Sequence, residues 1–217
     1  MSESNYIVLD VETNGIPSKR IDSRSDVCNH ISAYDGLHVI ELAFLHPQTC
    51  TELATLLHHT DPKFIDLMYT TRFHGITKEM IDATGRPATD VFREFYAFLV
   101  EHNIQTIVAH NVEFDMGFLI SESIFYGLPE LTNLLTNINI VCTMKDERVA
   151  SFMGSSKWPK LIEVFRKITH ESPKIMHRAL QDCRSCHVIY NHLFLDAHLK
   201  GPDEPDLHEL ENSHVCK

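Results

Sequence analysis

Apolar and polar positions follow two periods along the chain, one typical of strands and one typical of helices. Strand patterns cover five segments: "YIVLDVET" (6–13), "LHVIELAFLHP" (37–47), "TELATLLHHT" (51–60), "QTIVAHN" (105–111) and "INIVCTM" (138–144). Helical spacing recurs in "TKEMIDA" (77–83), "ATDVFREFYAFLVEHN" (88–103) and "VEFDMGFLISESIFYG" (112–127), and again from about Met176 to Leu199. This mixture of strands and helices predicts an α/β fold.

Turn-forming residues and polar stretches mark where these segments end. Asn111 precedes the helix expected over 112–127 and is expected to cap it, and Gly127-Leu128-Pro129 ends it. The polar stretch 17–36 predicts a long surface loop. Because 217 residues suffice for one well-formed core, we expect one domain over 1–200, followed by an acidic, disordered tail over 201–217.

Composition narrows the setting of the protein. Hydrophobic residues make up 43% of the chain, but no run reaches the length of a membrane span. The first residues, "MSESNYIVLD", lack the basic, apolar and small-residue order of a secretory signal. The six cysteines have no framework spacing, so we expect reduced thiols. A soluble intracellular protein, in the cytoplasm or the nucleoid or nucleus, is therefore expected, with no membrane partner.

The formal charge of −11 argues against broad neutralisation of duplex DNA phosphates. Seven basic residues nevertheless lie between Lys157 and Arg184, against three acidic residues. A solvated helix face and a phosphate-binding surface explain this basic stretch equally well.

Acidic residues occur in three separated motifs. Asp10 and Glu12 are two apart at the end of the first strand, so both carboxylates face the same side of the sheet. Asp115 falls in the first turn of the helix that follows "AHN", where an acid also suits the helix dipole. His177 is placed at or just before the start of the last helix, with Asp182 about one and a half turns inside it.

These five side chains together form a set suited to phosphodiester hydrolysis. Carboxylate oxygens suit hard cations such as Mg²⁺ and Mn²⁺, and four of them can hold two ions about 3.5 to 4 Å apart. Such a pair stabilises the attacking and leaving oxygens of an in-line displacement. His177 can accept a proton near neutral pH and so provides a general base.

The motifs "VLDVETNG", "FHGIT", "AHNVEFD" and "HRALQD", in this order, resemble those of the DnaQ-like 3′→5′ exonucleases of the DEDDh type. This family includes the proofreading subunit of bacterial replicative DNA polymerase. The resemblance covers roughly residues 5 to 195. It implies a ribonuclease H-like fold, with a mixed five-stranded sheet of three antiparallel and two parallel strands flanked by helices.

The resemblance also implies roles for the motif residues. Asp10 would bridge two Mg²⁺ or Mn²⁺ ions, Glu12 and Asp182 would complete the site of the ion that activates water, and Asp115 would hold the other ion, largely through water. His177 would be the general base.

Residues of the same motifs are expected to bind the substrate. Thr13 and Gly15 would lie against the 3′-terminal nucleotide, where a glycine permits close approach. His74 and Ile76, with Asn111, would line the pocket for that nucleotide. For His74 a locally packed loop histidine is the alternative. Beside His177, the basic stretch favours contact with the backbone of a single strand.

Other metal-ligand residues do not form a convincing site in the sequence. The "CRSC" at Cys183 to Cys186 is a lone pair within a helix, so structural cysteines are favoured over zinc ligands. His58, His59 and the remaining histidines form no recognisable ligand cluster.

The sequence thus predicts a two-metal-ion 3′→5′ exonuclease that releases nucleoside 5′-monophosphates from 3′ ends, as in proofreading or DNA repair. Single-stranded DNA is the preferred substrate and RNA the alternative, since contacts to the 2′-hydroxyl cannot be read from sequence. A non-catalytic nucleic-acid-binding module, tethered to a polymerase, is the hypothesis from another class. A polymerase or a second copy of the chain is a possible protein partner.

Overall fold

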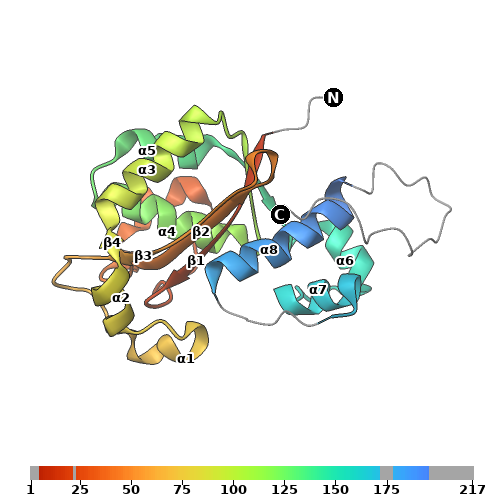
Figure 1. Ribbon diagram of the computed structural model, residues 1–217, viewed down its shortest axis with the longest axis horizontal. Coiled ribbons are helices and arrows are strands. Elements are labelled where there is room, and N and C mark those ends of the chain that lie inside the picture. Colours follow the sequence, from red (N-terminus) through yellow and green to blue (C-terminus); the bar gives the residue numbers. More distant parts are fainter. Residues whose placement is uncertain (1–4, 22, 172–177, 196–217) are drawn as a thin grey trace.

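The computed structural model describes residues 5–21, 23–171 and 178–195 (Figure 1). Within these residues a mixed six-stranded sheet has the order β4-β3-β2-β1-β5-β6. The strands are β1 (Tyr6–Thr13), β2 (Val39–His46), β3 (Thr51–His58), β4 (Arg86–Pro87), β5 (Thr106–Ala109) and β6 (Asn139–Cys142). The α-helices are α1 (Thr71–His74), α2 (Lys78–Thr84), α3 (Ala88–Glu101), α4 (Val112–Phe125), α5 (Pro129–Asn137), α6 (Glu147–Met153), α7 (Leu161–Thr169) and α8 (Ala179–Tyr190).

The predicted strands and their expected pairing are confirmed. β1, β2 and β3 form an antiparallel meander, and β5 and β6 extend the sheet in parallel with β1. The additional strand β4 has two residues and pairs with the end of β3. The strand is too short to show an alternating pattern and contains a proline, so it could not be predicted from the sequence.

Helices cover both faces of the sheet, and alternate residues of β1 point into the two resulting cores. Ile7 and Leu9 pack into the cluster formed with α3 and α4, whereas Tyr6 and Val8 pack into the cluster formed with α7 and α8. Figure 1 shows α8 lying along one face of the central strands and α3 with α4 behind the other. Because the period of a strand is two, Asp10 shares the α8 face with Val8.

The segment 17–36 is more than a surface loop. It contains two short 3₁₀ helices, Arg24–Asp26 and Cys28–Tyr34. Tyr34 is buried, and its ring meets Phe118 of α4 edge to face with centroids 5.2 Å apart. The Arg24 guanidinium donates to the carbonyl oxygens of Leu135 and Ile138 at 2.8 and 2.7 Å. The segment thus lies at the surface for most of its length, as predicted, but it is not a plain loop, because Val27, Ala33 and Tyr34 are buried whereas Ile31 stays exposed.

Two predicted helix ends also differ in the structure. Asn111 does precede α4, but its backbone is left-handed, with φ of 74°, and its side chain makes no capping hydrogen bond. α8 begins at Ala179, which puts Asp182 in the first turn instead of one and a half turns inside. A short π-helical turn, Asn191–Leu195, follows α8, and the tail 201–217 lies outside the described residues. Among the described helices, none is both long and apolar enough to cross a membrane.

Candidate active site

Three acidic side chains from two elements meet on the α8 face of the sheet. Asp10 and Glu12 extend from the end of β1, and Asp182 extends from the first turn of α8. Each offers a carboxylate oxygen, and these three oxygens lie within 4.8 Å of one another. Residues 172 positions apart in the chain thus share one site, as the motif chemistry predicted.

Asp115 joins this group from the other helical layer. It lies in the first turn of α4 and is 3% exposed. Its Oδ1 accepts a hydrogen bond of 3.2 Å from the backbone N–H of Val11, the residue between Asp10 and Glu12. The Asp115 carboxylate is therefore held against the end of β1, beside the other acids.

Burial, together with neighbouring negative charges, raises the pKa values of these carboxyl groups. Burial, and then the charges of Asp115, Glu12 and Asp182, hold the pKa of Asp10 well above its ordinary value. Burial, followed by Asp182 and Glu41, raises the pKa of Glu12 to about 8, and burial raises that of Asp115 to about 8. Gathered like charges of this kind are stabilised by a cation placed among them.

Glu41 and Arg178 belong to this site, although the sequence analysis did not single them out. Glu41 of β2 lies directly opposite Glu12 in the strand register and is 2% exposed. It accepts hydrogen bonds from Arg178 Nη2 at 2.7 Å and from the backbone N–H of Ala179 at 3.0 Å. This contact fastens the beginning of α8, and with it Asp182, to the sheet. An acid within the otherwise apolar run "VIELAFL" was the available signal.

The predicted general base cannot be positioned from the structure. His177 falls in 172–177, outside the described residues, and its role stays a prediction. The next residue, Arg178, is the N-cap of α8.

Thr13 and Gly15 lie just beyond the carboxylates, where β1 ends. The Thr13 hydroxyl donates to the carbonyl oxygen of Gly15 at 2.8 Å. A Cβ on Gly15 would lie 2.5 Å from Cδ2 of Leu37, so a side chain at this position would require the Leu37 side chain to shift. This close packing explains a glycine at position 15 without any substrate, and the predicted substrate contact is a second explanation.

The remaining predicted substrate residues have distinct environments. His74 is buried, and its Nδ1 accepts a 3.0 Å hydrogen bond from the backbone N–H of Ile76. The Ile76 side chain is fully buried in a cluster with Ile40, Leu56, Leu67 and Ile81. Asn111 is half-buried in its left-handed conformation, which is uncommon outside glycine and found most often for asparagine. Their assignment to substrate binding stays a prediction.

Several charges of the basic stretch have partners within the protein. Arg178 pairs with Glu41, Arg184 pairs with Glu52, and Lys167 Nζ donates to the carbonyl oxygen of Phe152 at 2.7 Å. For these three residues the structure favours an internal role over phosphate binding.

The cysteines of "CRSC" are structural, as predicted. Cys183 and Cys186 are buried in the core between α8 and the sheet. Cys183 Sγ donates to the Ala43 carbonyl oxygen at 3.4 Å, and Cys186 Sγ lies 3.3 Å from Thr143 Oγ1. Both are free thiols, as are Cys28 and Cys142, in agreement with the expectation of reduced thiols for these four cysteines.

The chain belongs to the exonuclease family RNase_T, whose model matches residues 7–190. The match includes all the acids of the candidate site, which are Asp10 and Glu12 of β1, Glu41 of β2, Asp115 of α4 and Asp182 of α8. The resemblance to DnaQ-like exonucleases is thereby confirmed.

Curated relatives are similar over part of the chain. The PolC-type DNA polymerase III of Streptococcus mutans is 28% identical over 132 residues, covering 61% of this chain and 8% of the polymerase. That of Bacillus cereus is 31% identical over 120 residues, covering 55% of this chain and 7% of the polymerase. The matched region is less than a tenth of either polymerase.

Solved structures of E. coli exonuclease I share the fold. The complex with a dA16 oligonucleotide has a TM-score of 0.64 at 12% identity, covering 89% of this chain and 42% of exonuclease I. The zinc-bound complex with single-stranded DNA has a TM-score of 0.66 at 14% identity, covering 90% and 41% of the two chains. At this level of identity the likeness supports the ribonuclease H-like α/β fold.

Proposed function

We propose that this protein is a metal-dependent 3′→5′ exonuclease that releases nucleoside 5′-monophosphates from the 3′ ends of single-stranded DNA. The observation that carries the proposal is the gathering of Asp10, Glu12 and Asp182 within 4.8 Å, with Asp115 bound to the same strand. Raised carboxyl pKa values at a family-typical position are a feature of functional sites. A purely structural role does not explain several buried acids with so few compensating cations.

The donor set fits hard divalent cations. All the candidate ligand atoms are carboxylate oxygens, which suit Mg²⁺ and Mn²⁺ and not softer metals. Two such ions, when bound, would polarise the scissile phosphate and stabilise the charge that develops on its oxygens. We assign Asp10 to both ions, Glu12 and Asp182 to one ion, and Asp115 to the other.

The protein's own groups supply the remaining steps. His177 accepts the proton of the attacking water, and Thr13, Gly15, His74, Ile76 and Asn111 position the terminal nucleotide. Glu41 and Arg178 are positioning residues. Their contact fixes the start of α8 and therefore the orientation of the Asp182 side chain. An ordered constellation of this kind lowers the barrier by holding the reactants in a reactive geometry.

The choice of substrate follows from the relatives. Exonuclease I, which shares the fold, has been solved with single-stranded DNA oligonucleotides, and the PolC-type relatives are DNA polymerases. RNA is the second candidate substrate, since nothing in the motifs excludes a 2′-hydroxyl. A polymerase partner, a second copy of the chain and an intracellular location belong to the same proposal.

Digestion of labelled oligonucleotides tests the proposal. With Mg²⁺ or Mn²⁺ the protein should shorten a 5′-labelled single strand one nucleotide at a time and should leave a circular single strand uncut. Asp10→Ala and His177→Ala should reduce the rate by at least about 100-fold, because each removes a group that acts in the transition state. Glu52→Gln, which changes a surface acid of β3, is the matched control and should retain the rate.

Paired DNA and RNA oligomers of one sequence separate the two substrates in the same assay. Cleavage of the RNA strand at a tenfold higher kcat/KM would assign the protein to RNA. Equal rates for Asp10→Ala, His177→Ala and the parent would refute the catalytic roles of these residues. Binding of the oligonucleotide by the parent without digestion would favour a nucleic-acid-binding module.

A further inference from the structure

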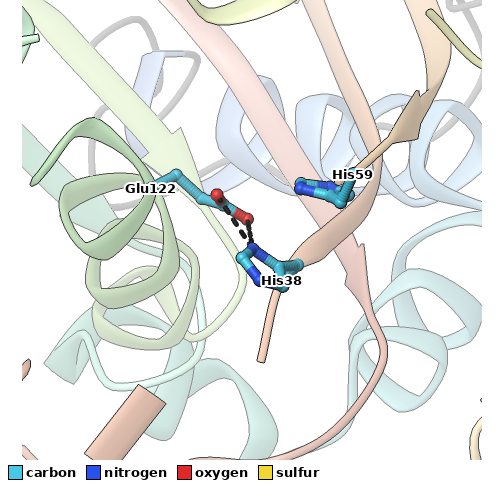
Figure 2. A group of neighbouring side chains, drawn as sticks. All are labelled: His38, His59 and Glu122. Carbon is cyan, nitrogen blue, oxygen red and sulfur yellow. Dashed lines mark hydrogen bonds and ion pairs between the residues drawn. The ribbon is translucent and has the colours of Figure 1, made fainter. Parts of the chain in front are cut away.

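A second cluster of metal-ligand side chains lies on a different part of the fold. His38 immediately precedes β2, His59 immediately follows β3, and Glu122 comes from α4. One ring nitrogen of each histidine and a carboxylate oxygen of Glu122 lie within 4.8 Å of one another. Figure 2 shows the three side chains pointing toward one another from three separate elements. The prediction that the histidines form no ligand cluster was therefore wrong.

The hydrogen bonds of the two rings leave the same nitrogen of each ring as the ligand atom. His38 Nε2 donates to Asp61 Oδ2 at 2.9 Å, and His59 Nε2 donates to the Val39 carbonyl oxygen at 2.6 Å. A histidine that donates one N–H to a carboxylate or a carbonyl is oriented to bind metal through its other nitrogen. In this cluster that nitrogen is Nδ1 in both rings, and Nδ1 of His38 faces both oxygens of Glu122 at 3.2 Å.

Burial and charge also favour a divalent cation. The side chains of His38, Glu122 and Asp61 are 3%, 1% and 7% exposed. Two carboxylates in so little solvent leave a net negative charge even when His38 carries a proton, because the nearby Lys63 ammonium is itself paired with Asp35. A doubly charged ion beside a neutral His38 balances the two carboxylates.

We propose that His38 Nδ1, His59 Nδ1 and Glu122 bind one ion of the zinc class, with a structural role. Two imidazoles and one carboxylate form a donor set typical of Zn²⁺, unlike the all-oxygen set of the active site. A cavity of about 290 Å³, lined in part by His38 and Glu122, gives room for water as the fourth ligand.

Ion binding requires only local movement of side chains. Zinc bonds of about 2.0 to 2.2 Å place neighbouring ligand atoms about 3.3 Å apart. Because the present separations are within 4.8 Å, no pair has to approach by more than about 1.5 Å. The Tyr126 hydroxyl, now 2.7 Å from His59 Nδ1, has to turn away. The His38 and His59 rings lie with centroids 4.4 Å apart and an interplanar angle of 32°, so their planes have to turn to direct both Nδ1 atoms at one ion.

The ion would connect the second site to the end of β1. The backbone N–H of His38 donates to Asn14 Oδ1 at 2.6 Å, and Asn14 Nδ2 donates to the carbonyl oxygens of Gly36 and Ile65 at 2.9 and 3.0 Å. Asn14 lies between Thr13 and Gly15. The ion would therefore stiffen the segment that follows the catalytic carboxylates, without taking part in the reaction.

Cobalt absorption provides the test, because Co²⁺ reports tetrahedral coordination with nitrogen ligands. The full chain carrying Asp10→Asn and Asp182→Asn, which weakens the carboxylate site, is freed of metal and titrated with Co²⁺. We expect one equivalent to produce an intense visible band, which Zn²⁺ removes. Zn²⁺ at about 100 times its Kd should raise the melting temperature by about 5 to 10 °C.

Two neighbouring variants distinguish the site from adventitious binding. In the same background His59→Gln should weaken Co²⁺ binding by at least about 100-fold, because it removes a direct ligand. His58→Gln changes the adjacent, exposed histidine and should leave the band and its affinity unchanged. Circular dichroism in EDTA checks that both variants fold.

Other outcomes would overturn the proposal. Absence of the visible band in the folded parent would mean that His38 serves only as a buried ion-pair partner of Glu122 and Asp61. A band of equal affinity in His59→Gln would mean that Co²⁺ binds elsewhere. Neither result bears on the exonuclease proposal, which rests on the other carboxylates.

Discussion

Replacing Arg178 with methionine tests how the beginning of α8 is held. The substitution keeps much of the apolar stem of the side chain but removes the guanidinium that donates to Glu41 at 2.7 Å. Glu41 is 2% exposed, and the N–H of Ala179 would be its remaining described donor. The carboxylate group as a whole would then lose one of its compensating positive charges.

The magnitude follows from the unequal burial of the two partners. The Glu41 side chain is 2% exposed and that of Arg178 is 42% exposed. Fully exposed pairs contribute about 0.2 to 1 kcal/mol, whereas removing one partner of a buried pair costs about 3 to 5 kcal/mol. Solvent screening of Arg178 places this case between them, at about 2 kcal/mol. For a domain of this size that lowers the melting temperature by about 4 to 8 °C.

Urea and thermal unfolding provide the assay, with a second ion pair of the same helix as the control. Arg184 of α8 pairs with Glu52 of β3, but these side chains are 49% and 40% exposed. Arg184→Met should therefore cost less than about 1 kcal/mol. A double-mutant cycle of Arg178→Met with Glu41→Gln should give a coupling free energy above about 1 kcal/mol.

Two results would refute this reasoning. Equal destabilisation by Arg178→Met and Arg184→Met would mean that burial of Glu41 does not strengthen the pair. Additive effects of Arg178→Met and Glu41→Gln would mean that the two side chains do not stabilise each other.

Two further predictions concern charge and packing. Because Glu12 and Asp115 have pKa values raised to about 8 in the fold, their contribution to stability is complete below their unfolded pKa values and is lost as the pH rises to about 8. In EDTA the melting temperature should fall from about pH 5 to pH 8, and Mg²⁺ should reduce the fall; an equal fall in Glu12→Gln would contradict this. Gly117→Ala in α4 would bring a Cβ to 2.3 Å from the Tyr34 hydroxyl oxygen and should cost about 1 to 3 kcal/mol in urea unfolding. Tyr34→Phe should restore most of that stability, and no rescue would mean that the contact is not the cause.

The sequence by itself predicted the main elements and the acids that the structure brings together, apart from Glu41. Strands that are buried on both faces can be predicted from their long apolar runs. β2, in which every residue is buried, is an example. Asp10 and Glu12 stand out against such a run, and the strand period alone places them on one face. The order and spacing of the motifs then identified the family.

Only the tertiary structure decided which distant side chains support or add to the site. In the sequence Glu41 is a single acid within an apolar run. Only the antiparallel register places it opposite Glu12, and only the fold places Arg178 in contact with it. His38, His59 and Glu122 are likewise unremarkable in sequence, since they lie in three different elements. Strand register and helix packing set these contacts, and they depend on interactions between residues that are far apart in the chain, which local periodicity does not encode.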